Sequence, residues 1–192
     1  MSKSGRKLFL ILALTMASMV TLSNFLVQYP VKYFGMNEIL TYGAFSYPIT
    51  FLITDLANRR FGKNIARQIV YIGFIFGVIL TIFFSDLISI RIAIGSGTAF
   101  LFAQLLDVQI FDKLRKKIWY LAPLASSSIG SLVDTFLFFF ISFYKTGVPW
   151  ITLGAGDFVV KMLITVIMLI PFRLLLNKIK DVTEYSSKIT LN

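Results

Sequence analysis

The sequence predicts an all-α polytopic membrane protein, a single bundle of six transmembrane helices with both termini in the cytoplasm. Six apolar stretches fill almost all of the 192 residues. Each stretch is close to the roughly 20 residues with which a helix crosses the ~30 Å hydrocarbon core of a bilayer. Lysine and arginine gather in every second gap, as they do in short cytoplasmic loops. The expected helices span residues 8–28, 40–57, 65–84, 88–110, 118–144 and 156–176.

The basic residues give the expected orientation. Fifteen of the 19 lie on the predicted cytoplasmic side, namely Lys3, Arg6, Lys7, Arg59, Arg60, Lys63, Arg67, Lys113, Arg115, Lys116, Lys117, Arg173, Lys178, Lys180 and Lys188. The remaining four are Lys32, Arg91 and Lys145 on the opposite side and Lys161 inside the sixth stretch. The net charge of +10 therefore follows from the topology. We expect the lipid bilayer, and no nucleic acid, as a partner.

The first stretch follows a basic segment, as a signal peptide does. Its apolar run continues into Ser23, Asn24 and Gln28 without a small-x-small cleavage site, which predicts an uncleaved helix. Asn24 and Gln28 fall on one helical face near the external end. Their amides are suited either to a polar ligand or to a bond with another helix.

The second stretch contains a helix-breaking segment, Gly43-Ala-Phe-Ser46-Tyr-Pro48. Proline lacks the amide donor and the residue before it avoids the helical conformation, so a broken or kinked helix is expected. Such breaks line substrate sites in transporters, which makes Ser46 a candidate ligand-binding residue. Towards the cytoplasm, Asp55 and Arg59 are four residues apart and form either a gate or a topology anchor.

The fourth stretch carries Arg91 near its external start, and Gln104 and Asp107 near its internal end. Arg91 is expected either to take part in gating or to anchor the interface by snorkelling. Gly95 and Gly97 allow another helix to approach closely. The third stretch contributes no candidate site residue.

The fifth and sixth stretches hold the deepest ionisable residues. Ser127, Ser131 and Asp134 are spaced by four and three, which places them on one helical face. An ionisable group at this depth costs a few kcal/mol or more, so Asp134 either bonds to neighbouring helices or serves substrate or coupling. Asp157 precedes Lys161 by four residues, the favourable order for a helical pair. That pair is either a structural ion pair or part of a binding site.

Composition excludes several kinds of chemistry. The chain has no Cys and no His, so it has no disulfide, thiol nucleophile or imidazole ligand. Its intramembrane acids stand on separate helices without a catalytic motif or metal-binding cluster. We therefore expect no enzymatic activity, no metal and no cofactor. A purely structural membrane protein would have little reason to hold so many polar groups at depth.

Together, these segments resemble the queuosine precursor transporter family of the vitamin uptake transporter group. The resemblance covers about residues 20–175 in order. Its segments are SNFLVQYPV (23–31), GAFSYP (43–48), FLITDL (51–56), RFG (60–62), RIA (91–93), QLLDV (104–108), FDKLR (111–115), LAP (121–123), Gly130, Asp134-Thr135, FFF (138–140), Asp157, Lys161 and Pro171.

The resemblance implies import of a 7-deazaguanine, such as 7-cyano-7-deazaguanine or its aminomethyl relative, for the tRNA modification queuosine. It also implies a multi-pass protein of the bacterial inner membrane, with a fold distantly like the substrate-binding subunits of vitamin importers. A carboxylate can accept two adjacent N–H donors of a guanine-like edge, and aromatic rings can stack on its plane. The expected substrate-binding residues are Asn24, Gln28, Ser46, Gln104, Ser131, Asp134, Asp157 and Lys161. The expected gating or coupling residues are Asp55, Arg59, Arg91 and Asp107.

Two functions stay open at this point. The first is alternating access around a midplane site, either proton-coupled with Asp134 as the carrier or by facilitated diffusion followed by intracellular trapping. The alternative is a substrate-binding subunit that requires an ATPase energising partner. Ala13 and Ala17 form a small-xxx-small pair suited to docking such a partner, to packing inside the bundle or to a homodimer.

Overall fold

The computed structural model describes residues 3–32, 40–83 and 90–176. Apart from a single bridge between Pro30 and Thr41, the regular structure of these ranges is helical. The helices are α1 (Lys3–Leu26), α2 (Gly43–Ser46), α3 (Pro48–Phe61), α4 (Lys63–Phe83), α5 (Ile90–Leu114), α6 (Leu121–Phe143) and α7 (Trp150–Leu176). In the described chain, α1, α4, α5, α6 and α7 are long and apolar enough to cross a membrane.

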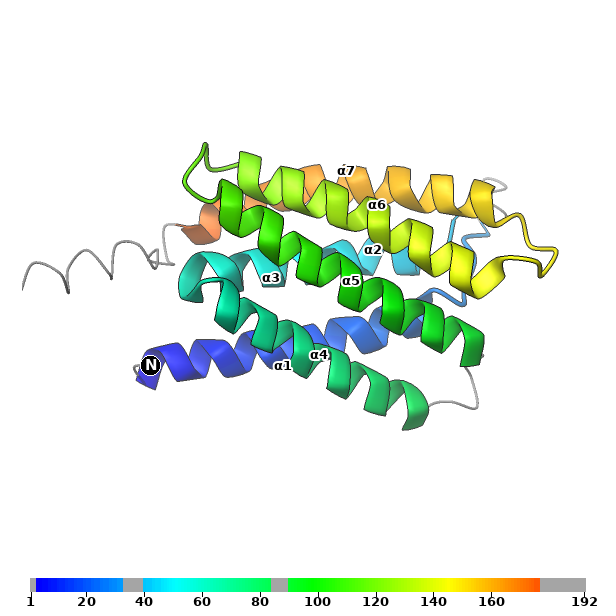
Figure 1. The fold of residues 1–192 in the computed structure, drawn as a ribbon, viewed down its shortest axis with the longest axis horizontal. Coiled ribbons are helices and arrows are strands. Elements are labelled where there is room, and N and C mark those ends of the chain that lie inside the picture. Colours follow the sequence, from blue (N-terminus) through cyan, green and yellow to red (C-terminus); the bar gives the residue numbers. More distant parts are fainter. Residues whose placement is uncertain (1–2, 33–39, 84–89, 177–192) are drawn as a thin grey trace, which may run out of the picture.

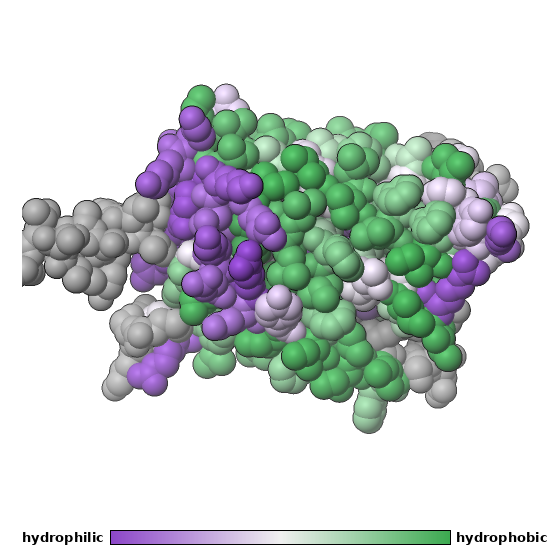
Figure 2. Space-filling view, viewed as in Figure 1, coloured by the Kyte–Doolittle hydropathy of each residue, from purple (hydrophilic) through white to green (hydrophobic). Residues whose placement is uncertain are grey.

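The helices lie side by side and alternate in direction (Figure 1). α2 and α3 follow one another along a further crossing, antiparallel to α1, so the predicted helical membrane fold is confirmed. α1 begins and α7 ends at the same end of the bundle. Hydrophilic residues gather at this end, and a hydrophobic band covers the middle of the face shown (Figure 2). This is the pattern expected of a cytoplasmic end next to a membrane-spanning region. The predicted cytoplasmic residues Lys178, Lys180 and Lys188 lie outside the described ranges.

Several helix boundaries differ from the predicted ones. α7 begins at Trp150 rather than at residue 156, so Asp157 and Lys161 lie further from the helix end than predicted. α1 ends at Leu26, which leaves Gln28 in the turn that follows. The predicted last residue of the third helix, Phe84, and the predicted start of the fourth, residues 88 and 89, fall outside the described residues.

The predicted break in the second crossing is confirmed at Tyr47, between α2 and α3. Pro48 is the first residue of α3 and has no amide hydrogen to donate to the preceding turn. The Tyr47 amide still donates to the Gly43 carbonyl at 3.1 Å, and the Thr50 amide donates to the Tyr47 carbonyl at 2.9 Å. The two helices follow one another along one crossing (Figure 1), while the missing Pro48 amide interrupts the hydrogen-bond ladder between them.

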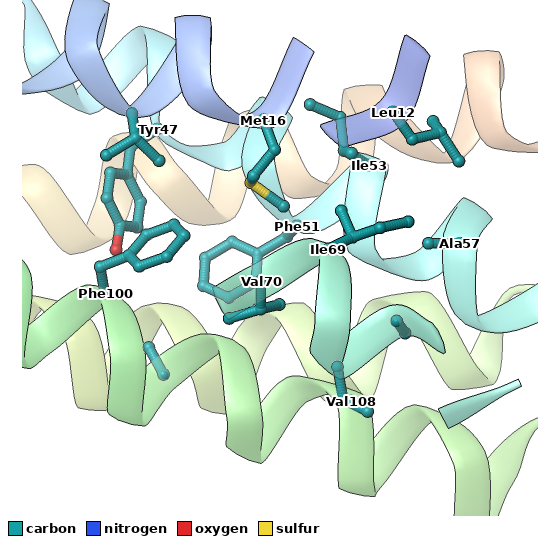
Figure 3. Packing of buried hydrophobic residues seen from close by; sticks show 13 residues of the cluster. Leu12, Met16, Tyr47, Phe51, Ile53, Ala57, Ile69, Val70, Phe100 and Val108 are labelled. Carbon is teal, nitrogen blue, oxygen red and sulfur yellow. The ribbon is translucent and has the colours of Figure 1, made fainter. Parts of the chain in front are cut away.

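The largest apolar cluster joins α1, α3, α4 and α5 (Figure 3). Met16, Phe51, Ile69 and Val70 lie inside it and are 1% exposed or less. Tyr47 lies at one end of this cluster, with its ring edge-on to Phe100. Lipid tails are as apolar as these side chains, so dense packing and hydrogen bonds rather than water exclusion hold such helices together.

The interface between α5 and α6 is the most extensive one in the bundle. A Cβ added at Gly95 of α5 would collide with the Ser142 hydroxyl of α6. Glycine at this position therefore permits the close approach that the sequence predicted. This contact fixes α6 against α5 and so sets where Asp134 stands.

Candidate functional site

Four buried polar side chains meet where α6 packs against α7, and we call them the Lys161 cluster: Asp134, Thr135, Asp157 and Lys161. Lys161 Nζ lies 2.7 Å from Asp134 Oδ2 and 2.5 Å from Asp157 Oδ2. It also donates a hydrogen bond to Thr135 Oγ1 at 3.2 Å, and Thr135 donates to Asp157 Oδ2 at 2.8 Å. Each of these side chains is 5% exposed or less.

Helical spacing explains why these groups meet. Asp157 and Lys161 are one turn apart on α7, while Asp134 and Thr135 are neighbours on α6. Two antiparallel helices therefore bring two carboxylates to one ammonium group. With all three groups ionised, the Lys161 cluster carries one uncompensated negative charge. Such a charge is costly at bilayer depth, and it favours a ligand that brings N–H donors or a cation.

A small cavity borders the Lys161 cluster. Its volume of about 20 Å³ is close to the space that one water molecule needs. The wall contains residues from α1, α2, α5, α6 and α7 and from the break in the second crossing. It is formed by Ser23, Asn24, Val27, Gly43, Tyr47, Ser96, Asp134, Phe138, Asp157 and Lys161.

Tyr47 covers the cluster from the break between α2 and α3. Its ring centroid lies 4.8 Å from Lys161 Nζ, within the range of a cation–π interaction. Its buried hydroxyl is near the carboxylate of Asp134 but makes no hydrogen bond with any described residue. The interrupted helix thus brings an aromatic face and a hydroxyl to the charged groups.

A hydrogen bond from Ser96 of α5 to Asn24 of α1 closes the cavity on a further side. These two residues also line a second, mostly apolar cleft between α1, α4 and α5, with a volume of about 380 Å³. The small polar cavity and the larger cleft therefore share one hydrogen-bonded pair as their common border.

A second polar group, the acidic pair Asp55 and Asp107, lies nearer the cytoplasmic end. Asp55 is on α3 and 2% exposed, and Asp107 is on α5 and fully buried. Their carboxyl groups are close enough to interact, and the Ser126 hydroxyl of α6 is near both of them. Ser126 and Ser127 of α6 donate to Asp55 over long distances of 3.3 Å and 3.4 Å. Over the described ranges, no group of three or more acidic side chains is arranged to hold a metal ion.

The structure brings half of the expected substrate-binding residues together. Asn24, Asp134, Asp157 and Lys161 line the small cavity. Ser46 lies behind it, with its hydroxyl 2.8 Å from that of Ser23.

The other expected binding residues lie outside the cavity wall. Ser131 is fully buried near Asp134 on α6, and Gln28 lies in the turn after α1. Gln104 bridges α5 to α3, because its amide nitrogen donates to Thr50 at 2.7 Å and its amide oxygen accepts from Thr54. That position suits a structural role for Gln104, and its role in binding stays a prediction.

The expected gating residues separate into two groups. Asp55 and Asp107 face each other, as described above. Arg59 donates to the Arg115 carbonyl at 2.7 Å and so ties α3 to the end of α5. Arg91 donates to the carbonyls of Ile141 and Tyr144 at 2.7 Å and 2.6 Å, and so caps the external end of α6. These contacts give Arg91 a structural role, and its part in gating stays a prediction.

Sequence patterns did not single out three polar residues of the cavity wall, Tyr47, Ser96 and Ser23. Ser96 stands between two glycines, and Tyr47 precedes the proline of the break. The glycines indicate close helix packing, and the proline indicates a helix break. Neither pattern identifies a site residue, because the direction of each side chain depends on how α1, α2 and α5 pack.

Comparison with known proteins gives a consistent family. The family model described as "Putative vitamin uptake transporter" matches residues 41–88 and 87–176. A "Queuosine precursor transporter" of Escherichia coli K12 is 33% identical over 196 residues, covering 88% of each chain. A "Probable queuosine precursor transporter" of Haemophilus influenzae is 37% identical over 154 residues, covering 68% of this chain and 66% of the relative. A Bacillus subtilis protein with the same description is 28% identical over 177 residues, covering 77% of this chain and 75% of the relative. No solved structure matches the chain.

Proposed function

Because this chain belongs to the queuosine precursor transporter family, within the putative vitamin uptake transporters, we propose that it imports 7-cyano-7-deazaguanine and related 7-deazapurines. It is a multi-pass protein of the bacterial inner membrane. Its relatives are named as transporters rather than enzymes. The substrate and the mechanism below are proposals for this chain.

The observation that carries the proposal is the excess of carboxylate in the Lys161 cluster. A guanine-like ring presents adjacent N–H donors along one edge, and a carboxylate accepts such a pair with two parallel hydrogen bonds. Asp134 and Asp157 share a single lysine, so one carboxylate can turn to the ligand while the other keeps the ion pair. Lys161 Nζ can then donate to the carbonyl of the ring.

The neighbouring wall provides the remaining contacts. Tyr47 and Phe138 offer aromatic faces for a flat ring, and Asn24 offers an amide that both donates and accepts. In the aminomethyl relative, an additional cationic group would compensate the negative charge of the cluster. We therefore propose that the site binds both the cyano and the aminomethyl compound. The aminomethyl compound should bind more tightly, because its positive charge compensates the cluster.

We propose alternating access as the mechanism. Small-molecule sites usually enclose about 300–1,000 Å³, far more than the 20 Å³ next to the Lys161 cluster. The site must therefore enlarge for a bicyclic ring. Breaking the Asn24–Ser96 hydrogen bond would join the cavity to the 380 Å³ cleft between α1, α4 and α5. The break at Tyr47 gives α2 a place to move relative to α3.

The test is uptake of labelled 7-cyano-7-deazaguanine into proteoliposomes that contain only this protein. We expect uptake by the wild type and its loss in Asp134→Asn, which keeps the shape of the side chain but weakens it as an acceptor. Asp112→Asn is the matched control on α5, because Asp112 is partly exposed and pairs with Arg115 and Lys63 at the cytoplasmic end. Normal uptake by Asp134→Asn would remove Asp134 from the site.

The same liposomes test the alternative of a subunit that needs an ATPase partner. Ala13 and Ala17 are 5% and 7% exposed, so this pair packs inside the bundle rather than offering a docking surface. We therefore propose that the chain works alone. Substrate binding without uptake by the purified wild type would instead support the subunit.

The energy source is also part of the proposal. Asp134, the proton carrier expected from sequence, is held in an ion pair with Lys161 at 2.7 Å. We propose that a proton-coupled mechanism uses a different acid, because Asp134 already forms an ion pair with Lys161.

A further inference from the structure

The acidic pair lies apart from the Lys161 cluster and contacts different residues. Asp55 follows Pro48 by seven residues on α3, which is about 10 Å along a helix axis. It faces α5 and α6 rather than α7's Lys161. None of the contacts that carry the proposed substrate site involves Asp55 or Asp107.

Within the described chain, the carboxylate of Asp107 lacks a hydrogen-bond donor. Both carboxylate oxygens of Asp107 are buried. The Ser126 hydroxyl is near them but donates to Asp55, and no donor in the described chain meets either oxygen with hydrogen-bond geometry. Asp107 is 0% exposed, so solvent cannot supply a donor directly. The Asp55 carboxyl group is close by, but two ionised carboxylates have no hydrogen to share. One proton held between Asp55 and Asp107 would give the pair one hydrogen bond and remove one of its two charges.

The described residues around the pair provide no positive charge to replace that proton. Among the described residues, no lysine or arginine forms an ion pair with Asp55 or Asp107. Ser126 and Ser127 face the pair from α6, and Thr165 of α7 lies beside Asp55. Two buried carboxylates at this depth would repel each other and remain desolvated, whereas a shared proton removes one of the charges.

A small cavity next to Asp55 has room for one water molecule that could accept the proton. It lies between α3, α6 and α7, is lined by Asp55, Ser127 and Thr165 among others, and has a volume of about 10 Å³. This is about the lower limit for one water molecule. The Thr165 hydroxyl is buried and has no hydrogen-bond partner in the described ranges, so it is available to such a water.

We propose that Asp55 and Asp107 form a proton-binding dyad that couples transport to the proton gradient. The dyad holds one proton when α3 and α5 are packed as in this structure, and it releases that proton towards the cytoplasm when the two helices separate. On release, one carboxyl O–H bond breaks, water on the cytoplasmic side accepts the proton, and two carboxylates remain. The coupling role rests on the proposed transport function, while the bound proton does not.

The bound proton is tested by infrared spectroscopy of the purified protein at neutral pH. A protonated carboxyl group has a carbonyl stretching band separate from that of a carboxylate. We expect this band in the wild type, in Asp112→Asn and in Asp134→Asn, and its loss in the double variant Asp55→Asn/Asp107→Asn. Asparagine resembles a protonated aspartate in shape and charge, so the double variant should fold. An unchanged band in the double variant would overturn the dyad.

The coupling role is tested in proteoliposomes with an imposed inward proton gradient. If one proton accompanies each neutral substrate, accumulation rises by up to about tenfold per pH unit. We expect this gain in the wild type and in Asp112→Asn. Asp107→Asn should lose the gain but still exchange labelled for unlabelled substrate, because exchange requires no net proton release.

The outcomes separate the two proposals. Wild-type uptake that does not depend on the proton gradient would overturn the coupling role and leave the transport function intact. A full gain in substrate accumulation in Asp107→Asn would do the same. Absence of both uptake and exchange in the wild type would count against the transport function, while the infrared band would still decide whether the dyad holds a proton.

Discussion

The Lys161 cluster and the acidic pair are both buried groups of two carboxylates, yet only the first contains a cation. In the Lys161 cluster, an ammonium group lies within 2.7 Å of both acids. In the acidic pair, Asp55 accepts only long bonds from two serines and Asp107 accepts none from the described residues. The first arrangement suits a ligand with N–H donors, and the second suits a proton. The difference shows how one bundle can separate substrate recognition from energy coupling.

Removing the cation would make the two regions alike and should have the largest effect. In Lys161→Met, Asp134 and Asp157 would remain buried with no positive charge between them. Breaking a buried pair in this way typically costs about 3–5 kcal/mol. We expect a lower thermal midpoint in detergent and no detectable substrate binding. Lys113→Met, at an exposed position near the end of α5, is the control. A Lys161→Met protein as stable as this control would contradict the pairing.

Neutralising one acid of the Lys161 cluster should weaken binding without unfolding the protein. In Asp157→Asn, Lys161 keeps Asp134 as a partner, so the cluster becomes balanced in charge. Loss of one charged hydrogen bond is worth about 1.5–3 kcal/mol, or roughly 10–100-fold in affinity. Titration of the purified variant with the aminomethyl ligand measures this change. Equal affinities of the variant and the wild type would show that the excess carboxylate does not serve the ligand.

A substitution between the two regions should affect stability alone. Gln104→Leu removes the bridge from α5 to Thr50 and Thr54 of α3, and lost hydrogen bonds of this kind are each worth about 0.6 kcal/mol within membranes. We expect a small decrease in thermal midpoint and unchanged substrate affinity. A clear loss of affinity at normal stability would instead return Gln104 to the binding site, as the sequence predicted.

The sequence predicted much of the fold because membrane helices have simple requirements. The length of the apolar stretches and the basic residues in every second gap were enough to predict the membrane crossings. Pro48 was enough to predict the break in the second crossing. Boundaries were less certain where apolar and small residues continue past a helix end. The stretch from Trp150 to residue 155 is one example, and it belongs to α7.

The candidate site was predictable only in part. Spacing on one helix paired Asp157 with Lys161 and placed Asp134 deep in the bundle. Nothing in the spacing says that α6 and α7 cross so that Asp134 reaches the same lysine. The same limit applies to Asp55 and Asp107, which are on different helices and meet only through the packing of α3 against α5. Contacts between helices depend on side-chain volumes on both surfaces, which periodicity does not record.

The most direct test of this division is substrate binding at equilibrium by two isosteric variants, Asp134→Asn and Asp107→Asn, measured beside the wild type by titration with 7-cyano-7-deazaguanine. We expect Asp134→Asn to lose affinity by at least about tenfold, since it removes a charged acceptor, and Asp107→Asn to bind as the wild type does. Equal losses in both variants, or a loss confined to Asp107→Asn, would contradict the assignment of substrate to the Lys161 cluster and of the proton to the acidic pair.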